Sequence, residues 1–302
     1  MIDILLVVLA LIFLVVGAIT DIKTREVPDW VSYSAIFAGI GIRLLASLAA
    51  FDWSWLVAGV LGLVGFGIIA YAMFYLGQWG GGDSKLLIGL GALIGIDVKF
   101  GAGLREFGNS FVNSFAASFI VWVLIAGALY GTVWIIALAL RNRKQFSANA
   151  KAILKSKKYR LPKYAAFAAA LALVAIAFLA TNDILLRIPL IGLAIILPLT
   201  FYFTVAVSAV EKCCMLKLVK PEQLTEGDWI VKDVIIAGKR ITGPKDLGIS
   251  KEQIRKLIAL RTKGKVRKDF KVLIKNGIPF VPSFLLAYLA AMFIGNLLVL
   301  LL

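Results

Sequence analysis

The 302-residue sequence contains no histidine and only two cysteines, the adjacent pair Cys213 and Cys214. The absence of histidine excludes serine/histidine and cysteine/histidine catalysis, and it excludes zinc sites of the His-Glu-x-x-His type. A disulfide between adjacent residues is strained and a metal would need further ligands, so the two cysteines are predicted to be reduced thiols. We therefore expect no cofactor and no metal, and an enzyme with this sequence must use carboxylates.

Charged residues are also scarce, at 17% of the chain against 61% hydrophobic residues. Several apolar runs reach the ~17 residues that a helix needs to cross a bilayer. This pattern predicts an all-α polytopic membrane protein with about eight transmembrane helices, at residues 2–20, 31–50, 53–76, 86–104, 111–140, 164–180, 184–210 and 278–302. The first run lacks an Ala-x-Ala-like cleavage site, so we expect it to be retained.

The basic residues predict the orientation of these helices. When the loops are assigned alternately to the two faces, 29 of the 33 Lys and Arg residues fall on one face. The positive-inside rule then places the basic loops in the cytoplasm and both termini outside. The net charge of +16 is attributed to these loops and the anionic lipid headgroups that they face, and we expect no nucleic-acid partner.

Three parts of the chain are predicted. Residues 1–210 hold transmembrane helices, cytoplasmic catalytic loops and a basic cytosolic loop at 141–163, and residues 278–302 form the final transmembrane helix. Residues 211–277 form a small, basic cytosolic α+β appendage. In the appendage we expect a strand at 229–236, a tight turn, a partner strand at 239–242, and a helix that begins at Ser250 with a capping box completed by Gln253.

Four carboxylates remain as candidates for chemistry at the cytoplasmic face: Asp21, Glu26, Asp29 and Asp83. Asp21 ends the first predicted helix and Asp83 opens the fourth, so packing of these helices would bring the two carboxylates together. One member of such a dyad stays protonated, because two adjacent like charges are costly. The ionised member activates a water molecule and the protonated member donates to the scissile carbonyl oxygen. The plain alternative for Asp83 is helix capping after the glycine run.

Two motifs and a third segment resemble a known family. The run from Gly80 to Gly95, with its Gly-Gly-Gly-Asp-Ser-Lys start, is similar to the signature of the type IV prepilin and archaeal preflagellin (archaellin) peptidases. These are the Gly-x-Gly-Asp membrane aspartyl proteases. Asp21 to Asp29, an aspartate followed by Val-Pro-Asp, resembles the family's other motif, and the stretch from Gly277 to Phe284 resembles its Pro-Phe-x-Pro segment.

The resemblance implies an aspartic endopeptidase with a six-helix-type core plus extra helices. Asp21 and Asp83 would be the catalytic pair, and the substrate would be a prepilin-like or archaellin precursor. Its short basic leader would be cut off before the hydrophobic helix, at the cytoplasmic face of the cell membrane. Paired Cys-x-x-Cys elements, which the methylating bacterial members carry, are absent, so we expect cleavage without N-methylation.

Supporting roles are expected for residues beside the pair: Gly80, Gly82, Lys85, Glu26 and Asp29. The glycines would let a peptide approach closely. Lys85 would lower the pKa of Asp83 or anchor its helix in the headgroups, and Glu26 and Asp29 would attract a basic leader or simply start the second helix.

Two other functions also use acidic residues in a polytopic membrane protein. A transporter or ion-coupled channel would use acidic residues near the bilayer midplane, whereas these lie at the interface. A presenilin or signal-peptide-peptidase-like protease would carry a Tyr-Asp pair in mid-helix, but Thr20 precedes Asp21. The choice between pilin and archaellin substrates, and the oligomeric state, stay open.

Overall fold

The computed structural model describes residues 2–96, 114–180, 182–264, 266–267 and 269–296. Among these residues, six helices are long and apolar enough to cross a membrane: α1 (Ile2–Thr24), α2 (Asp29–Ala50), α3 (Ser54–Tyr75), α6 (Phe115–Arg141), α8 (Lys157–Leu179) and α9 (Ile184–Val210). Two shorter apolar helices are α4 (Gly81–Ile94) and α11 (Val281–Phe293). Each of the eight predicted apolar stretches therefore contains a helix, and the predicted fold class is confirmed.

Several boundaries differ from those predicted, and α1 ends at Thr24, four residues later than predicted. Helix α4 ends at Ile94, and most of the remainder of its predicted range lies outside the described residues. Helix α11 begins at Val281, three residues later than predicted, and Pro282 lies in its first turn, where proline suits a helix start. The basic stretch 141–163 is not a loop, because it forms α7 (Arg143–Lys155) and the first turns of α8. Apolar side chains of α7 pack against Phe201 and Val205 of α9, and this packing stabilises the helix.

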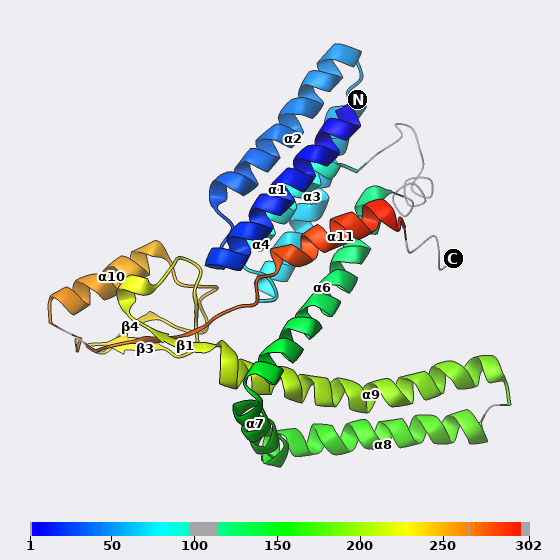
Figure 1. Cartoon of the computed structure of the whole chain (residues 1–302), viewed down its shortest axis with the longest axis vertical. Helices are drawn as coiled ribbons and strands as arrows, with labels where there is room; N and C mark the ends of the chain where they lie inside the picture. Colours follow the sequence, from blue (N-terminus) through cyan, green and yellow to red (C-terminus); the bar gives the residue numbers. More distant parts are fainter. Residues whose placement is uncertain (1, 97–113, 181, 265, 268, 297–302) are drawn as a thin grey trace.

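Helix α4 lies between α2 and α3 in the bundle that also contains α1, α6 and α11 (Figure 1). Small residues allow the backbones to touch. A Cβ atom on Gly62 of α3 would lie 2.1 Å from the carbonyl oxygen of Gly91, and one on Gly89 would lie 2.8 Å from the Cβ of Ala35. Close packing through glycine is typical of helices in membranes, and here it fixes how α4 is rotated.

The C-terminal end of α4 is held by a buried arginine of α2. Arg43 is only 4% exposed, and its guanidinium donates hydrogen bonds of 2.8–3.1 Å to the carbonyl oxygens of Ala92, Leu93 and Ile94. These carbonyls have no partners within the helix, and their partial negative charge favours a cation. Arg43 thereby satisfies the end of α4 in the interior of the bundle.

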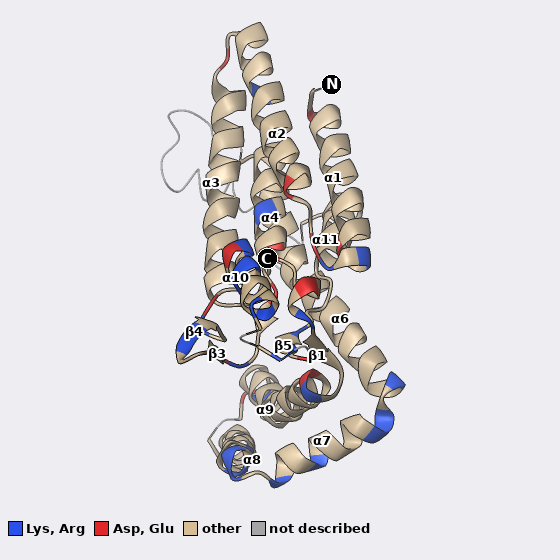
Figure 2. Cartoon of the chain, turned by 90° about the vertical axis from the view of Figure 1, so that its left-hand side faces the viewer, with Lys and Arg blue, Asp and Glu red and all other residues tan. Residues whose placement is uncertain are grey.

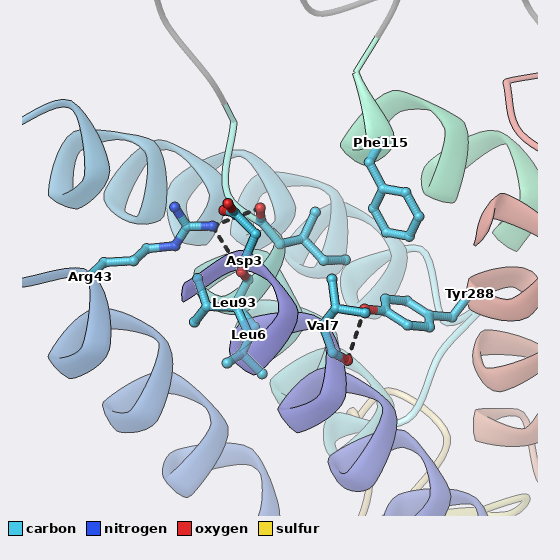
Figure 3. Close-up of a pocket in the computed structure, with 8 residues that line it drawn as sticks. Asp3, Leu6, Val7, Arg43, Leu93, Phe115 and Tyr288 are labelled. Carbon is cyan, nitrogen blue, oxygen red and sulfur yellow. Dashed lines mark hydrogen bonds between the residues drawn. The ribbon is translucent and has the colours of Figure 1, made fainter. Parts of the chain in front are cut away.

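Arg43 also lines a pocket of about 110 Å³ (Figure 3), together with Asp3, Leu6, Val7, Leu93, Ile94, Phe115 and Tyr288. At 1.5 Å per residue along α1, this pocket lies roughly 20–27 Å from Asp21. It is therefore separate from the aspartates discussed below.

The appendage has its own hydrophobic core and two small sheets. Strands β1 (Leu216–Val219), β5 (Val272–Lys275) and β2 (Trp229–Ile230) form an antiparallel sheet with β5 in the centre. Strands β3 (Val234–Ile236) and β4 (Lys239–Thr242) form a hairpin, and α10 (Lys251–Thr262) packs beside it. The short helices are η1 (Glu211–Met215) and η2 (Pro221–Gln223).

The predicted details of the appendage are partly confirmed. The turn at Ala237 and Gly238, with φ of 49° and 75°, and the capping box of Ser250 and Gln253 are present. A single strand at 229–236 is wrong, because a bend at Val231 and Lys232 divides it into β2 and β3. These two strands pair in different sheets.

Cys213 and Cys214 lie in the π-helical turn η1, where the chain leaves α9. The structure joins them in a disulfide, so the prediction of two reduced thiols is wrong. The wide turn brings the two adjacent sulfur atoms together.

Arg43→Met tests whether Arg43 stabilises the C-terminal end of α4. Methionine keeps most of the side-chain length and removes every hydrogen-bond donor. We expect the free energy of unfolding to fall by ~2–4 kcal/mol, since three buried carbonyls lose charged partners. Thermal unfolding in detergent measures the loss, with Lys144→Met on the exposed face of α7 as the control. Equal melting temperatures for Arg43→Met and the wild type would contradict this role.

Candidate functional site

Asp21 lies in the last turn of α1 and is only 4% exposed. Its Oδ2 atom accepts a hydrogen bond of 2.9 Å from the backbone N–H of Val281, the first residue of α11. The N-terminus of a helix presents unpaired N–H groups and a partial positive charge, which favour a carboxylate. The stretch from Gly277 to Phe284 therefore meets the first motif directly.

Asp83 is the third residue of α4, and its Oδ2 atom accepts a 3.0 Å hydrogen bond from the N–H of Gly80. Asp83 therefore does cap the start of α4. Part of the residue is exposed, yet protein surrounds the carboxyl group closely enough that burial, followed by the charge of Asp21, raises the pKa of Asp83 to about 7. Helices α1 and α4 pack directly one turn from the two aspartates, since a Cβ atom on Gly17 would lie 2.9 Å from the side chain of Leu86. The two carboxyl groups therefore lie on neighbouring helix ends, and capping does not exclude a second role.

The glycine run contacts the Val-Pro-Asp part of the first motif. A Cβ atom on Gly82 would lie 3.2 Å from both the Cβ and the backbone nitrogen of Val27. Gly80 supplies the N–H that Asp83 accepts. The two motifs, more than fifty residues apart in sequence, are therefore packed against each other, and Gly82 makes the close approach possible.

Lys85 and Asp29 form an ion pair across the same contact, with 2.7 Å between Nζ and Oδ1. The hydrogen bond to Asp29, and more weakly the charges of Asp29, Tyr33 and Glu226, raises the pKa of Lys85. Burial and Asp21 raise the pKa of Asp83, so a lowering effect of Lys85 on this pKa stays a prediction. Burial and Asp21 outweigh any effect of the lysine, whose charge faces Asp29. Glu26 is exposed and has no ion pair among the described residues.

Residues that the sequence did not single out complete the surroundings. Trp79, just before the glycine run, is 4% exposed and packs against Phe280 and Phe284, with ring centroids 5.9 and 5.3 Å apart. Arg25, one turn after Asp21, donates a hydrogen bond to the carbonyl oxygen of Gly277, and its guanidinium lies 5.5 Å from the ring centroid of Trp134. The one sequence feature that could have identified Trp79 and Arg25 as site residues is their position next to the two motifs.

Two aspartates held together at the ends of two apolar helices define a class of site, a carboxylate pair in a polytopic membrane protein. Comparison with known proteins shows a similarity to such a class: residues 8–136 match the Type IV leader peptidase family. This segment contains both Asp21 and Asp83, so the resemblance seen in the motifs is confirmed for this part of the chain.

Curated relatives agree with this match. The chain is 29% identical to a preflagellin peptidase of Methanococcus maripaludis and 30% identical to one of Methanocaldococcus jannaschii, each over 130 residues. These segments cover 43% of this chain and 55% and 54% of the two relatives. A preflagellin peptidase of Methanococcus voltae is 33% identical over 86 residues, which are 28% of this chain and 36% of that protein. The chain thus spans about half the length of the first two relatives.

The raised pKa of Asp83 predicts how the stability of the protein depends on pH. The pKa is about 7 in the folded protein against an ordinary value of 3.8, so ionisation of Asp83 opposes folding as the pH rises from about 4 through 7. Asp83→Asn keeps an acceptor for the N–H of Gly80 and cannot ionise. Above pH 7 we expect the free energy of unfolding of this variant to exceed that of the wild type by a few kcal/mol at most, and its melting temperature to be higher.

The difference should shrink as the pH falls from 7 toward 4, and melting curves in detergent at several pH values would measure it. Glu252→Gln removes an exposed carboxylate on α10 and serves as the control. A constant difference between Asp83→Asn and the wild type at every pH would contradict a raised pKa.

Proposed function

We propose that the protein is an aspartic endopeptidase that removes the short leader of prepilin-like or preflagellin precursors in the membrane. The observation that carries the proposal is the meeting of Asp21 and Asp83, from two separate motifs, with the pKa of Asp83 raised to about 7 by burial and by Asp21. The preflagellin peptidase names of the relatives support the same activity.

The geometry suggests different roles for the two carboxyl groups. Asp21 accepts the N–H of Val281 at the start of α11, an arrangement that favours its ionised form. Asp83 is largely protonated below pH 7. In the proposed reaction, Asp21 takes a proton from a water molecule while the water oxygen attacks the scissile carbonyl carbon, and Asp83 donates its proton to the carbonyl oxygen.

The tetrahedral intermediate then collapses. Its hydroxyl proton returns to Asp83, the peptide C–N bond breaks, and the proton held by Asp21 passes to the departing nitrogen. The products are a carboxylic acid on the leader and a free amine on the mature protein. The dyad returns to its starting protonation state, so the reaction consumes only water.

The proposed substrate carries a basic leader. Glu26, exposed and without an ion pair among the described residues, is the carboxylate that we propose attracts this leader. Asp29 is a weaker candidate than the sequence indicated, because Lys85 already balances its charge. The names of the relatives favour a preflagellin-type substrate, and we propose cleavage without N-methylation because the chain lacks paired Cys-x-x-Cys elements.

We propose that the site faces the cytoplasm. Figure 2 shows Lys and Arg gathered on the appendage, on α7 and at the start of α8, toward the same end of the molecule as the C-terminal end of α1. Asp21 lies at that end of α1. The positive-inside rule assigns such an end to the cytoplasmic side of the cell membrane, where a newly made precursor would meet it.

No observation favours the alternatives. A transport site is expected near the bilayer midplane, whereas Asp21 lies in the last turn of α1 and Asp83 in the first turn of α4. The relatives are preflagellin peptidases, and none of those compared is a transporter or a presenilin-like protease.

Asp21→Asn and Asp83→Asn test the dyad, because asparagine keeps the shape and the acceptor but cannot exchange a proton. We expect each substitution to lower cleavage by at least ~10³-fold. The double variant should be no worse than either single one, because the two residues act as a unit. Cleavage is measured by gel shift and N-terminal sequencing after co-expression with a preflagellin or prepilin precursor.

Asp228→Asn in the appendage is the matched control and should cleave normally. Each variant must also insert into the membrane and elute from detergent like the wild type. Robust cleavage by Asp21→Asn or Asp83→Asn at the same bond would remove that residue from the mechanism.

Glu26→Gln and Asp29→Asn test how the leader is attracted. We expect Glu26→Gln to raise KM for a basic-leader substrate several-fold with little change in kcat, because a charge that steers binding acts on ground state and transition state alike. Asp29→Asn should have the smaller effect on KM, since Asp29 is paired with Lys85. Initial rates at two salt concentrations measure both, and an unchanged KM for Glu26→Gln would count against steering.

A further inference from the structure

The end of α1 and the middle of α6 approach each other beside the start of α11, through two pairs of residues, each pair one helical turn apart. One pair is Asp21, in the last turn of α1, and Arg25, the residue directly after α1; the other is Tyr130 and Trp134 on α6. The guanidinium of Arg25 lies 5.5 Å from the ring centroid of Trp134, and the rings of Trp134 and Tyr130 lie 5.7 Å apart. One turn before Tyr130, Gly127 packs on Phe280, the residue before the Val281 whose N–H Asp21 accepts, and the electrostatic influence of Asp21 and Arg25 on Tyr130 agrees with this placement. Tyr130 therefore stands beside the dyad, on the side of Asp21.

The part of α6 that contains Tyr130 is held by contacts on both sides of this residue. One turn before Tyr130, a Cβ atom on Gly127 would lie 2.7 Å from the ring of Phe280, so α6 packs directly on the segment that precedes α11. One turn after Tyr130, the ring of Trp134 contacts the guanidinium of Arg25, which also donates a hydrogen bond to the carbonyl oxygen of Gly277. The half-buried ring of Tyr130 is thus held in place on both sides.

Its hydroxyl group, by contrast, makes no hydrogen bond to any residue that the structure describes. The Oδ2 atom of Asp21 is occupied by the N–H of Val281, and Arg25 is engaged by Gly277 and Trp134. Tyr130 is therefore a rigidly placed donor next to the dyad that the fold itself does not use.

We propose that Tyr130 contacts the substrate, and that its hydroxyl donates a hydrogen bond to a backbone carbonyl oxygen beside the scissile bond. This inference rests on the proposed peptidase activity. A peptide bond cut just before a hydrophobic helix must be extended at the dyad, so its carbonyls lack partners within a helix. An unpaired carbonyl in apolar surroundings is costly, and a phenol donor would satisfy one of them.

Tyr130→Phe removes only the hydroxyl and keeps the ring against Trp134. We expect kcat/KM to fall about tenfold, the effect of one lost hydrogen bond. The melting temperature in detergent should stay unchanged, because the hydroxyl bonds no described residue. Tyr164→Phe, at an exposed tyrosine of α8, is the matched control and should equal the wild type in both measurements.

Proximity is measured separately by placing the photoreactive residue p-azidophenylalanine at position 130 in Asp83→Asn, a variant expected to bind the precursor without cutting it. We expect a light-dependent adduct with the purified precursor from position 130 and none from position 164. An adduct from position 130 together with reduced cleavage by Tyr130→Phe supports the contact.

The outcomes separate two failures. A wild-type protein that leaves the precursor intact overturns the peptidase activity, and the role of Tyr130 with it. A wild type that cleaves while Tyr130→Phe cleaves equally well, or while position 130 gives no adduct, overturns the role of Tyr130 alone. A loss of activity in Tyr130→Phe that follows a fall in melting temperature assigns Tyr130 a structural role and also overturns the proposal.

Discussion

The hydrogen bond from the N–H of Val281 to the carboxylate of Asp21 joins residues that are 260 positions apart. It fixes the end of the first helix against the start of α11, the last helix that the structure describes. A negative charge on Asp21 is compatible with burial because the N-terminal N–H groups of α11 face it. The proline-rich segment before α11 sets where those N–H groups lie, and Arg25 holds the same segment through Gly277. Much of the site depends on this one junction.

Asp83 depends on the placement of α4, which is too short to be positioned by its own length. Glycines let α4 approach α2 and α3 at backbone distance, and Arg43 satisfies its far end. Both interactions act on the helix as a rigid body, so they fix the position of its first turn as well. The carboxyl group of Asp83 is thus held where burial opposes its ionisation, a local cost that the packing of the whole helix offsets.

The sequence predicted much of this arrangement, and the reasons are physical. Long apolar runs, the Asp21 and Asp83 motifs, and the capping box at Ser250 are local signals, and each has its predicted counterpart in the structure. Contacts between distant segments could not be predicted from the sequence. Nothing in the sequence around Arg43 shows that it caps α4, and nothing around Lys85 shows that Asp29 is its partner.

Local sequence patterns predict the wrong structure in two places where tertiary packing decides the outcome. The basic stretch 141–163 looks like a loop because it is polar, but a few apolar side chains suffice to dock α7 on α9. The run 229–236 looks like one strand because of its composition, but its two halves pair in different sheets. A tyrosine in the middle of an apolar helix, such as Tyr130, carries no sequence signal of its own.

The appendage is continuous with the site. Strand β5 is the central strand of its three-stranded sheet, and the chain runs from Lys275 at the end of β5 to Val281 in six residues. Trp229 packs near Gly77 at the start of the loop that leads to Asp83, and the charge of Glu226 acts on Lys85. The appendage therefore adjoins the segments that lead to both aspartates: the chain before α11 on the side of Asp21, and the α3–α4 loop on the side of Asp83. The position of its central strand limits where the segment before α11 can lie, because only five residues separate Lys275 from Val281.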